Sequence, residues 1–195
     1  MRTAEISRKT KETDITVRWN LDTAGIPVVK SGSGFLDHML EQVGHHSGTT
    51  LFVECDGDTH IDLHHSVEDI AIALGRALLQ ALGDKAGIER YGFYAVAMDE
   101  ALARCTLDLS GRFHLAYACP ISRDKVGDLD VELVEHFFHS LAENAKMTLH
   151  LDLERGENAH HCVEALFKAF ARALAMAIGP ARNGSKEIPS TKGAL

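Results

Sequence analysis

The stretch HHSVEDIAIALGRAL, residues 64–78, recurs as HHCVEALFKAFARAL at residues 160–174 with eight of the fifteen positions identical. Further upstream, FLDHMLEQV at residues 35–43 aligns with LVEHFFHSL at residues 133–141 and places His38 over His136. Self-similarity of this kind indicates a structural unit that is present more than once. We therefore expect two copies of one unit, residues 1–90 and 91–195, that together form one compact body.

Each copy combines segments with strand and helix character. Alternating, β-branched sequence predicts strands, and apolar residues at helical spacing predict helices. The expected strands are residues 15–21, 50–54, 94–98, 102–109, 113–118 and 147–153, and the expected helices are residues 35–44 and the segments that begin near residues 64, 131 and 160. Several strands and two helices per half indicate an α+β protein whose helices cover one face of each sheet. Only the tail, residues 179–195, is expected to be irregular.

Composition excludes several classes of protein. The chain of 195 residues has 20 lysines and arginines against 28 aspartates and glutamates, a formal charge of −8. This acidic balance argues against nucleic acid or an anionic membrane as the main partner. The four cysteines form no CxxC pair, which favours reduced thiols and a cytoplasmic protein. The first residues are too charged for a secretory signal, and Lys168 and Arg172 interrupt the most apolar helical stretch, so we expect no membrane span.

Histidine is the unusual feature, because the 12 histidines gather at the repeated motifs. Glu68 follows His65 at the three-residue spacing that places two side chains on one helix face, and the second copy has the same spacing. Adjacent helical residues diverge by about 100°, so the two histidines of each pair are not expected to bind the same ion. The simplest arrangement has two equivalent sites: His38, His65, Glu68 and His160 in one, and His136, His161, Glu164 and His64 in the other. Three imidazoles and one carboxylate suit Zn, Fe or Ni, with Mn favoured only weakly.

Other residues suggest an anion site and an acid/base group. Arg90, Arg112 and Lys192 lie near the ends of expected elements, and Ser190 adds a hydroxyl donor; arginine binds phosphate through two parallel hydrogen bonds and lysine as a point charge. Glu12 is a carboxylate beside a strand, as is the pair Asp99–Glu100. Among the remaining histidines His46 is the best functional candidate, because it ends the helix that carries His38. No role is assigned to His45, His60, His114, His139 or His150.

Together these motifs carry a family resemblance. RKTKETDITV (8–17), GFLDHMLEQVGHH (34–46), DGDTHIDLHHSVEDIAIALGRAL (56–78), SGR (110–112), HFFHSLA (136–142), MTLHLDL (147–153), GENAHHCVEALFKAFARAL (156–174) and IPSTKGAL (188–195) resemble the imidazoleglycerol-phosphate dehydratases of histidine biosynthesis. The resemblance runs from about Arg8 to Leu195. It implies an α+β fold in which two roughly four-stranded sheets flank the four helices of both halves. It also implies a homo-oligomer of 24 subunits, with two Mn²⁺ ions in each active site where subunits meet, although other divalent metals are compatible.

The resemblance also implies roles for individual residues. The metal ligands would be His38, His64, His65, Glu68, His136, His160, His161 and Glu164, which agrees with the repeat. Contacts to the substrate and its phosphate would come from Glu12, His46, Arg90, Arg112, Lys168, Ser190 and Lys192.

The implied reaction removes water from imidazole glycerol phosphate and leaves imidazole acetol phosphate. Metal ions on the ring nitrogens would stabilise an imidazolate and then a diazafulvene-like intermediate. Glu12 is our first choice for moving the protons, with Glu164 or a metal-bound water second. Two alternatives remain, a dinuclear His/Glu metallohydrolase and a metal-storage shell protein. A store would need no phosphate-binding residues near its metal.

Overall fold

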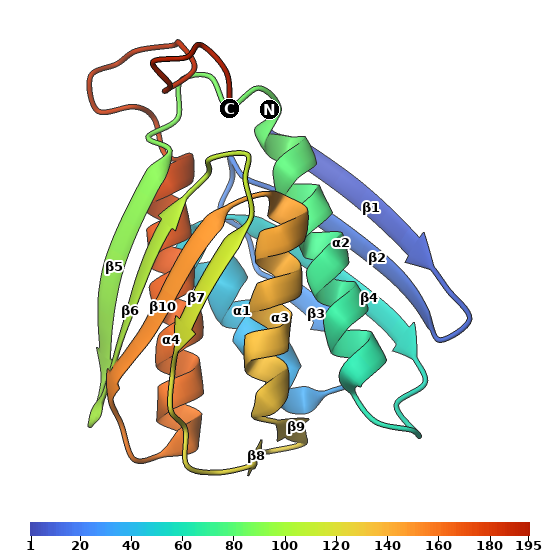
Figure 1. Cartoon of the computed structure of the whole chain (residues 1–195). Helices are drawn as coiled ribbons and strands as arrows, with labels where there is room; N and C mark the ends of the chain where they lie inside the picture. The colour runs from blue at the N-terminus through green and yellow to red at the C-terminus, as the bar shows by residue number, and fades with distance from the viewer.

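Two four-stranded sheets face each other across four helices in this computed structural model, which describes residues 1–195 (Figure 1). The first sheet has the order β1 (Thr3–Lys9), β2 (Thr13–Asn20), β4 (Thr50–Gly57) and β3 (Val28–Lys30). The second has the order β5 (Tyr91–Met98), β6 (Ala101–Asp108), β10 (Thr148–Arg155) and β7 (His114–Ala118). In each sheet the first three strands are antiparallel and the fourth is parallel to its neighbour. The two halves of the chain therefore have the same topology.

The helices also correspond between the halves. The first half contains α1 (Gly34–Ser47) and α2 (His64–Leu82), and the second contains α3 (Glu132–Ala145) and α4 (Ala159–Ile178). Their apolar faces are buried, as the spacing predicts; in α2, for example, Val67, Ile70 and Leu74 are almost inaccessible to solvent. No helix is both long enough and apolar enough to span a bilayer. The predicted α+β fold class with an internal duplication is confirmed.

Helices pair across the two halves rather than within them. α1 packs on α4, and α2 packs on α3. The α2–α3 contact is especially close, because a Cβ atom on Gly75 would lie 2.6 Å from the Leu141 carbonyl oxygen. Aromatic rings join α3 to α4, with the ring centroids of Phe138 and Phe167 4.8 Å apart. Every helix start that carries a paired histidine thereby lies beside a helix from the other half.

The structure contains strands that sequence patterning did not predict. In the edge strand β1 only Ala4 is buried, so the strand lacks an apolar alternation that could be recognised. β3 has three residues, too few for a periodic signal. A small hairpin, β8 (Lys125–Val126) and β9 (Leu129–Asp130), lies between β7 and α3. Its Asp128 accepts hydrogen bonds from Ser33 Oγ, Gly34 N and Phe35 N, and so supports the N-cap residue Ser33 at the start of α1 in the other half.

The C-terminal tail has no regular structure. Residues 179–195 contain no helix, and their one β-bridge pairs Pro180 with Ile88. Figure 1 shows this tail at the end of the molecule opposite the N-terminal ends of the four helices.

Candidate metal centre

The α1–α4 cluster consists of His38, His160 and Glu164, whose ligand atoms all lie within 4.8 Å of one another. His160 and Glu164 are one turn apart at the start of α4, where the side chain of Asn158 accepts hydrogen bonds from the first backbone N–H groups. His38 projects from α1 of the other half. The Nε2 atoms of His38 and His160 lie 3.1 and 2.9 Å from the same carboxylate oxygen of Glu164. This arrangement points two imidazoles and a carboxylate at one position.

Glu164 is ionised although its side chain is only 7% exposed. Burial alone would raise its pKa, but hydrogen bonds from Lys168, His38 and His160 outweigh burial and lower the pKa to about 2. Lys168 Nζ lies 2.6 Å from the second carboxylate oxygen, one turn further along α4. The Glu164 carboxylate is therefore available in its ionised form as a cation ligand, with Lys168 paired to its other oxygen.

The α2–α3 cluster consists of His64, Glu68 and His136 and has the same arrangement. His64 and Glu68 are one turn apart at the start of α2, and His136 projects from α3 of the other half. The rings of His64 and His136 have centroids 4.5 Å apart. His136 Nε2 lies 3.4 Å from a Glu68 oxygen, yet it is buried and makes no hydrogen bond. A buried nitrogen without a partner is uncommon in folded proteins, and a metal ion would satisfy it.

Within one chain, the structure groups the predicted ligands differently from the expected division. His38 lies with His160, and His136 lies with His64, as expected. The glutamates are exchanged, because Glu164 joins His38 and Glu68 joins His136. The first histidine of each pair lies one helical turn before the glutamate of its cluster, so the two side chains are neighbours on the helix surface. The second histidine is rotated by about 100° around the helix axis and is not part of that cluster.

The second histidines, His65 and His161, each have a carboxylate on Nδ1. His65 Nδ1 lies 3.0 Å from Asp58, and His161 Nδ1 lies 2.8 Å from Glu100. These hydrogen bonds raise the pKa of both imidazoles, and the bond from His161 lowers the pKa of Glu100 to about 2. A carboxylate that holds Nδ1–H leaves Nε2 free to bind a metal and fixes the direction of the ring. The role of Asp58 was not predicted, because Asp58 lies in the loop between β4 and α2 and no helical spacing relates it to His65.

Glu12 lies at the same end of the molecule, in the turn between β1 and β2. One of its carboxylate oxygens is 3.9 Å from His65 Nε2, and no hydrogen bond to that carboxylate is present. Gln42 was not predicted either, although it lies one turn after His38 and its Nε2 is 3.4 Å from His38 Nδ1. The i to i+4 spacing on α1 could have revealed it. His46, two turns after His38, has a pKa that burial and nearby positive charges lower.

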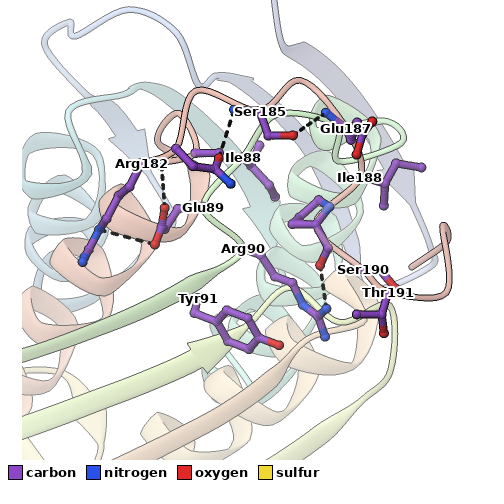
Figure 2. A pocket seen from close by; sticks show the side chains of 13 residues that line it. Ile88, Glu89, Arg90, Tyr91, Arg182, Ser185, Glu187, Ile188, Ser190 and Thr191 are labelled. Carbon is purple, nitrogen blue, oxygen red and sulfur yellow. Dashed lines mark hydrogen bonds and ion pairs between the residues drawn. The ribbon is translucent and has the colours of Figure 1, made fainter.

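The predicted phosphate-binding residues lie elsewhere. Arg90 and Ser190 line a pocket of about 640 Å³ formed by the C-terminal tail, and Figure 2 shows the Arg90 guanidinium turned toward the tail. Arg90 donates to both carboxylate oxygens of Asp108, at 2.7 and 3.0 Å, and to the Pro189 carbonyl. Lys192 donates its backbone N–H to Ser190 Oγ, and the glycine before Arg112 lies against the last residue of the chain. Arg90, Arg112, Ser190 and Lys192 thus gather at the tail.

The two groups of residues are far apart within one chain. Glu164 lies in the second turn of α4, whereas the tail pocket adjoins the end of this 20-residue helix. At 1.5 Å per residue, the 14 residues from Glu164 to Ile178 span about 21 Å. A three-carbon glycerol chain cannot bridge that distance. The predicted contacts can meet at one substrate only if they come from different copies of the chain.

Comparison with known proteins gives one consistent match. A family model described as imidazoleglycerol-phosphate dehydratase matches residues 31–174. The imidazoleglycerol-phosphate dehydratase of Cereibacter sphaeroides is 52% identical over 195 residues, all of both chains, and that of Halorhodospira halophila is 53% identical over 194 residues, 100% of this chain and 98% of the other. The crystal structure of the Staphylococcus aureus enzyme has a TM-score of 0.84 at 41% identity and covers 92% of this chain and 99% of its own. The Pyrococcus furiosus enzyme, solved in complex with (S)-C348, has a TM-score of 0.83 at 34% identity and covers 97% and 100%.

Proposed function

The chain belongs to the imidazoleglycerol-phosphate dehydratase family and is therefore a hydro-lyase of histidine biosynthesis, and we propose that its two histidine–carboxylate clusters hold the metal ions of this dehydration. Two observations support the proposal: His136 Nε2 is buried without a hydrogen-bond partner, and Glu164 stays ionised while almost fully buried. Imidazoles with a carboxylate suit several divalent ions. We propose Mn²⁺, two per active site, following the family resemblance.

We propose that a neighbouring copy completes each site. Each cluster offers three ligands, and His65 and His161 belong to neither cluster of their own chain. Their Nδ1 atoms are held by carboxylates, so each keeps Nε2 available as a metal ligand. The separation of about 21 Å along α4 between Glu164 and the tail supports the same conclusion. We therefore propose a homo-oligomer with shared active sites, of 24 subunits as the family resemblance implies.

Within this assembly the protein's own residues would bind and orient the substrate. Arg90, Arg112, Ser190 and Lys192 of one copy would hold the phosphate, and His46 and Lys168 would lie beside the clusters of another. Bound metal ions would act as Lewis acids toward the imidazole ring. Fixing the substrate at both ends would align its carbon chain with the acid/base group.

We assign the proton transfers to Glu12. Its carboxylate accepts no hydrogen bond and lies 3.9 Å from His65 Nε2, so it is free to take up a proton. Glu164 is less suited, because three donors hold its carboxylate and its pKa is about 2. A base works best when its pKa is near the working pH. Glu164 is therefore better placed as a ligand than as the base.

The test is to incubate the Mn²⁺-loaded protein with imidazole glycerol phosphate and to follow imidazole acetol phosphate. We expect turnover, and a loss of roughly 10²–10⁴-fold in kcat for Glu12→Gln with unchanged metal content. If no imidazole acetol phosphate forms with any divalent metal, the proposed metal-dependent dehydration is refuted. Metal-dependent phosphate release would favour a dinuclear metallohydrolase, and tight metal binding without reaction would favour a storage shell.

We also propose a cytoplasmic location. All four cysteines are unpaired, and Cys105 is fully buried in the second sheet. Free thiols are typical of a reducing compartment. Fractionation of cells that express the tagged chain would test the location.

A further inference from the structure

Asp69 is a buried carboxylate that the dehydration described above does not use. It follows Glu68 on α2 and is 5% exposed. One oxygen accepts hydrogen bonds from Arg8 Nε and Nη2 at 2.9 and 2.7 Å, and the other accepts one from Thr13 Oγ1 at 2.6 Å. Both oxygens are thus occupied by groups from the first sheet. Arg8 and Thr13 lie on β1 and β2, on either side of the turn that contains Glu12 (Figure 1).

The turn itself is well defined. Thr10 Oγ1 accepts hydrogen bonds from the backbone N–H groups of Glu12 and Thr13, and the Glu12 carbonyl accepts one from Asp58 N at 3.0 Å. The backbone of Glu12 is therefore held from both sides, while its carboxylate is free. The contacts of Asp69 fix this whole turn to the helix that carries His64, His65 and Glu68.

The second half of the molecule has no such network. The residue equivalent to Asp69 is Ala165, which is buried in α4. There the matching turn, between β5 and β6, carries Glu100, whose carboxylate accepts directly from His161 and from the backbone N–H of Asn158. That turn is fixed by its own carboxylate. In the first half the carboxylate of the turn stays free, and a second carboxylate fixes the turn.

We propose that Asp69 is a positioning residue for the dehydration: through Arg8 and Thr13 it holds Glu12 beside His65 and the α2–α3 cluster. This inference rests on the proposed role of Glu12. A buried ion pair adds little net stability compared with apolar residues of the same size, so a structural role alone does not account for it. A displacement of about 1 Å in an acid/base group can reduce turnover by 10²-fold.

The test uses Thr13, because Asp69→Asn risks a general loss of folding. Thr13→Val removes the hydroxyl that donates to Asp69 and keeps the side-chain shape. We expect kcat to fall about 10-fold or more while KM and the Mn²⁺ content stay within about twofold. Thr13→Ser, which keeps the hydroxyl, should recover most of the turnover. Thr16→Val is the matched control, since Thr16 is on the same strand and makes no contact with Asp69.

A double variant separates this inference from the role of Glu12. If Asp69 acts through Glu12, adding Thr13→Val to Glu12→Gln should lower kcat no further. A multiplicative loss in the double variant would mean a merely structural role and would overturn the inference. So would normal kcat in Thr13→Val while Glu12→Gln is impaired; the role of Glu12 would then stand. Normal kcat in Glu12→Gln would overturn the assignment of Glu12 and the positioning inference together.

Discussion

Replacing His136, whose Nε2 atom is buried without a hydrogen bond, should change the stability of the fold in opposite directions in the metal-free and the metal-loaded protein. A buried polar atom without a hydrogen bond destabilises a fold by about 1–3 kcal/mol. His136→Phe removes that nitrogen and its destabilising effect. The larger phenyl ring crowds its neighbours, and this overpacking cancels part of the gain in stability. Without metal, the variant should therefore be about 1 kcal/mol more stable than the wild type, a rise of roughly 2–4 °C in Tm for a chain of this size.

With metal the order should reverse. A ligand present at a hundredfold excess over its Kd stabilises the folded state by about 2.7 kcal/mol per site. The wild type gains this at both clusters, whereas His136→Phe retains only the α1–α4 cluster. The variant should then be less stable than the wild type by roughly 2 kcal/mol.

Urea unfolding followed by circular dichroism, after chelation and again after addition of Mn²⁺, measures both differences. Metal analysis should find about half as much bound ion in the variant. His139→Phe is the control, because His139 is exposed on the same helix and belongs to neither cluster. The reasoning is refuted if the metal-free variant is less stable than the wild type, or if it binds as much metal.

Other perturbations test the packing, the tail and the assembly. Gly75→Ala should destabilise the fold by about 1–3 kcal/mol in urea, because the new Cβ would lie 2.6 Å from the Leu141 carbonyl oxygen; an unchanged midpoint would show that α2 and α3 can separate freely. Asp128→Ala should lower stability by about 1 kcal/mol, since it removes the acceptor for the first N–H groups of α1 and for the hydroxyl of its N-cap Ser33. Hydrogen bonds from Ser33, Phe35 and Gly34 overcome burial and lower the pKa of Asp128, so this difference should persist at neutral pH and vanish only as the pH falls below the ordinary value of 3.8; a difference that shrinks already near neutrality would contradict the cap. Lys192→Ala should raise KM and leave the metal content unchanged, and a normal KM would remove the tail from the substrate site. Chelation should shrink the particle in light scattering and Mn²⁺ should restore it, because ligands from two chains link metal binding to association; a particle that keeps its size would exclude the metal as a cross-link.

The duplication and the types of ligand could be predicted from the chain because both depend on short-range spacing. The two HHxxE motifs, with His38 and His136 upstream, are separated by almost the same number of residues, so alignment alone shows the repeat. Helical periodicity is also local, and all four helices were predicted near their observed positions. The carboxylate of Glu12 was recognised as a candidate base, but its freedom from hydrogen bonds was not visible in the sequence.

Only the tertiary structure decided which glutamate joins which histidines. Glu68 can share a helix face with the histidine three or four residues before it, and the packing of α2 on α3 selects His64 because His136 meets it there. Strand β1 escaped prediction because an edge strand with one buried residue lacks a periodic apolar pattern. The separation of Arg90 and Ser190 from both clusters depends on the direction and length of α4. Contacts between residues distant in the chain are set by packing, and no local spacing records them.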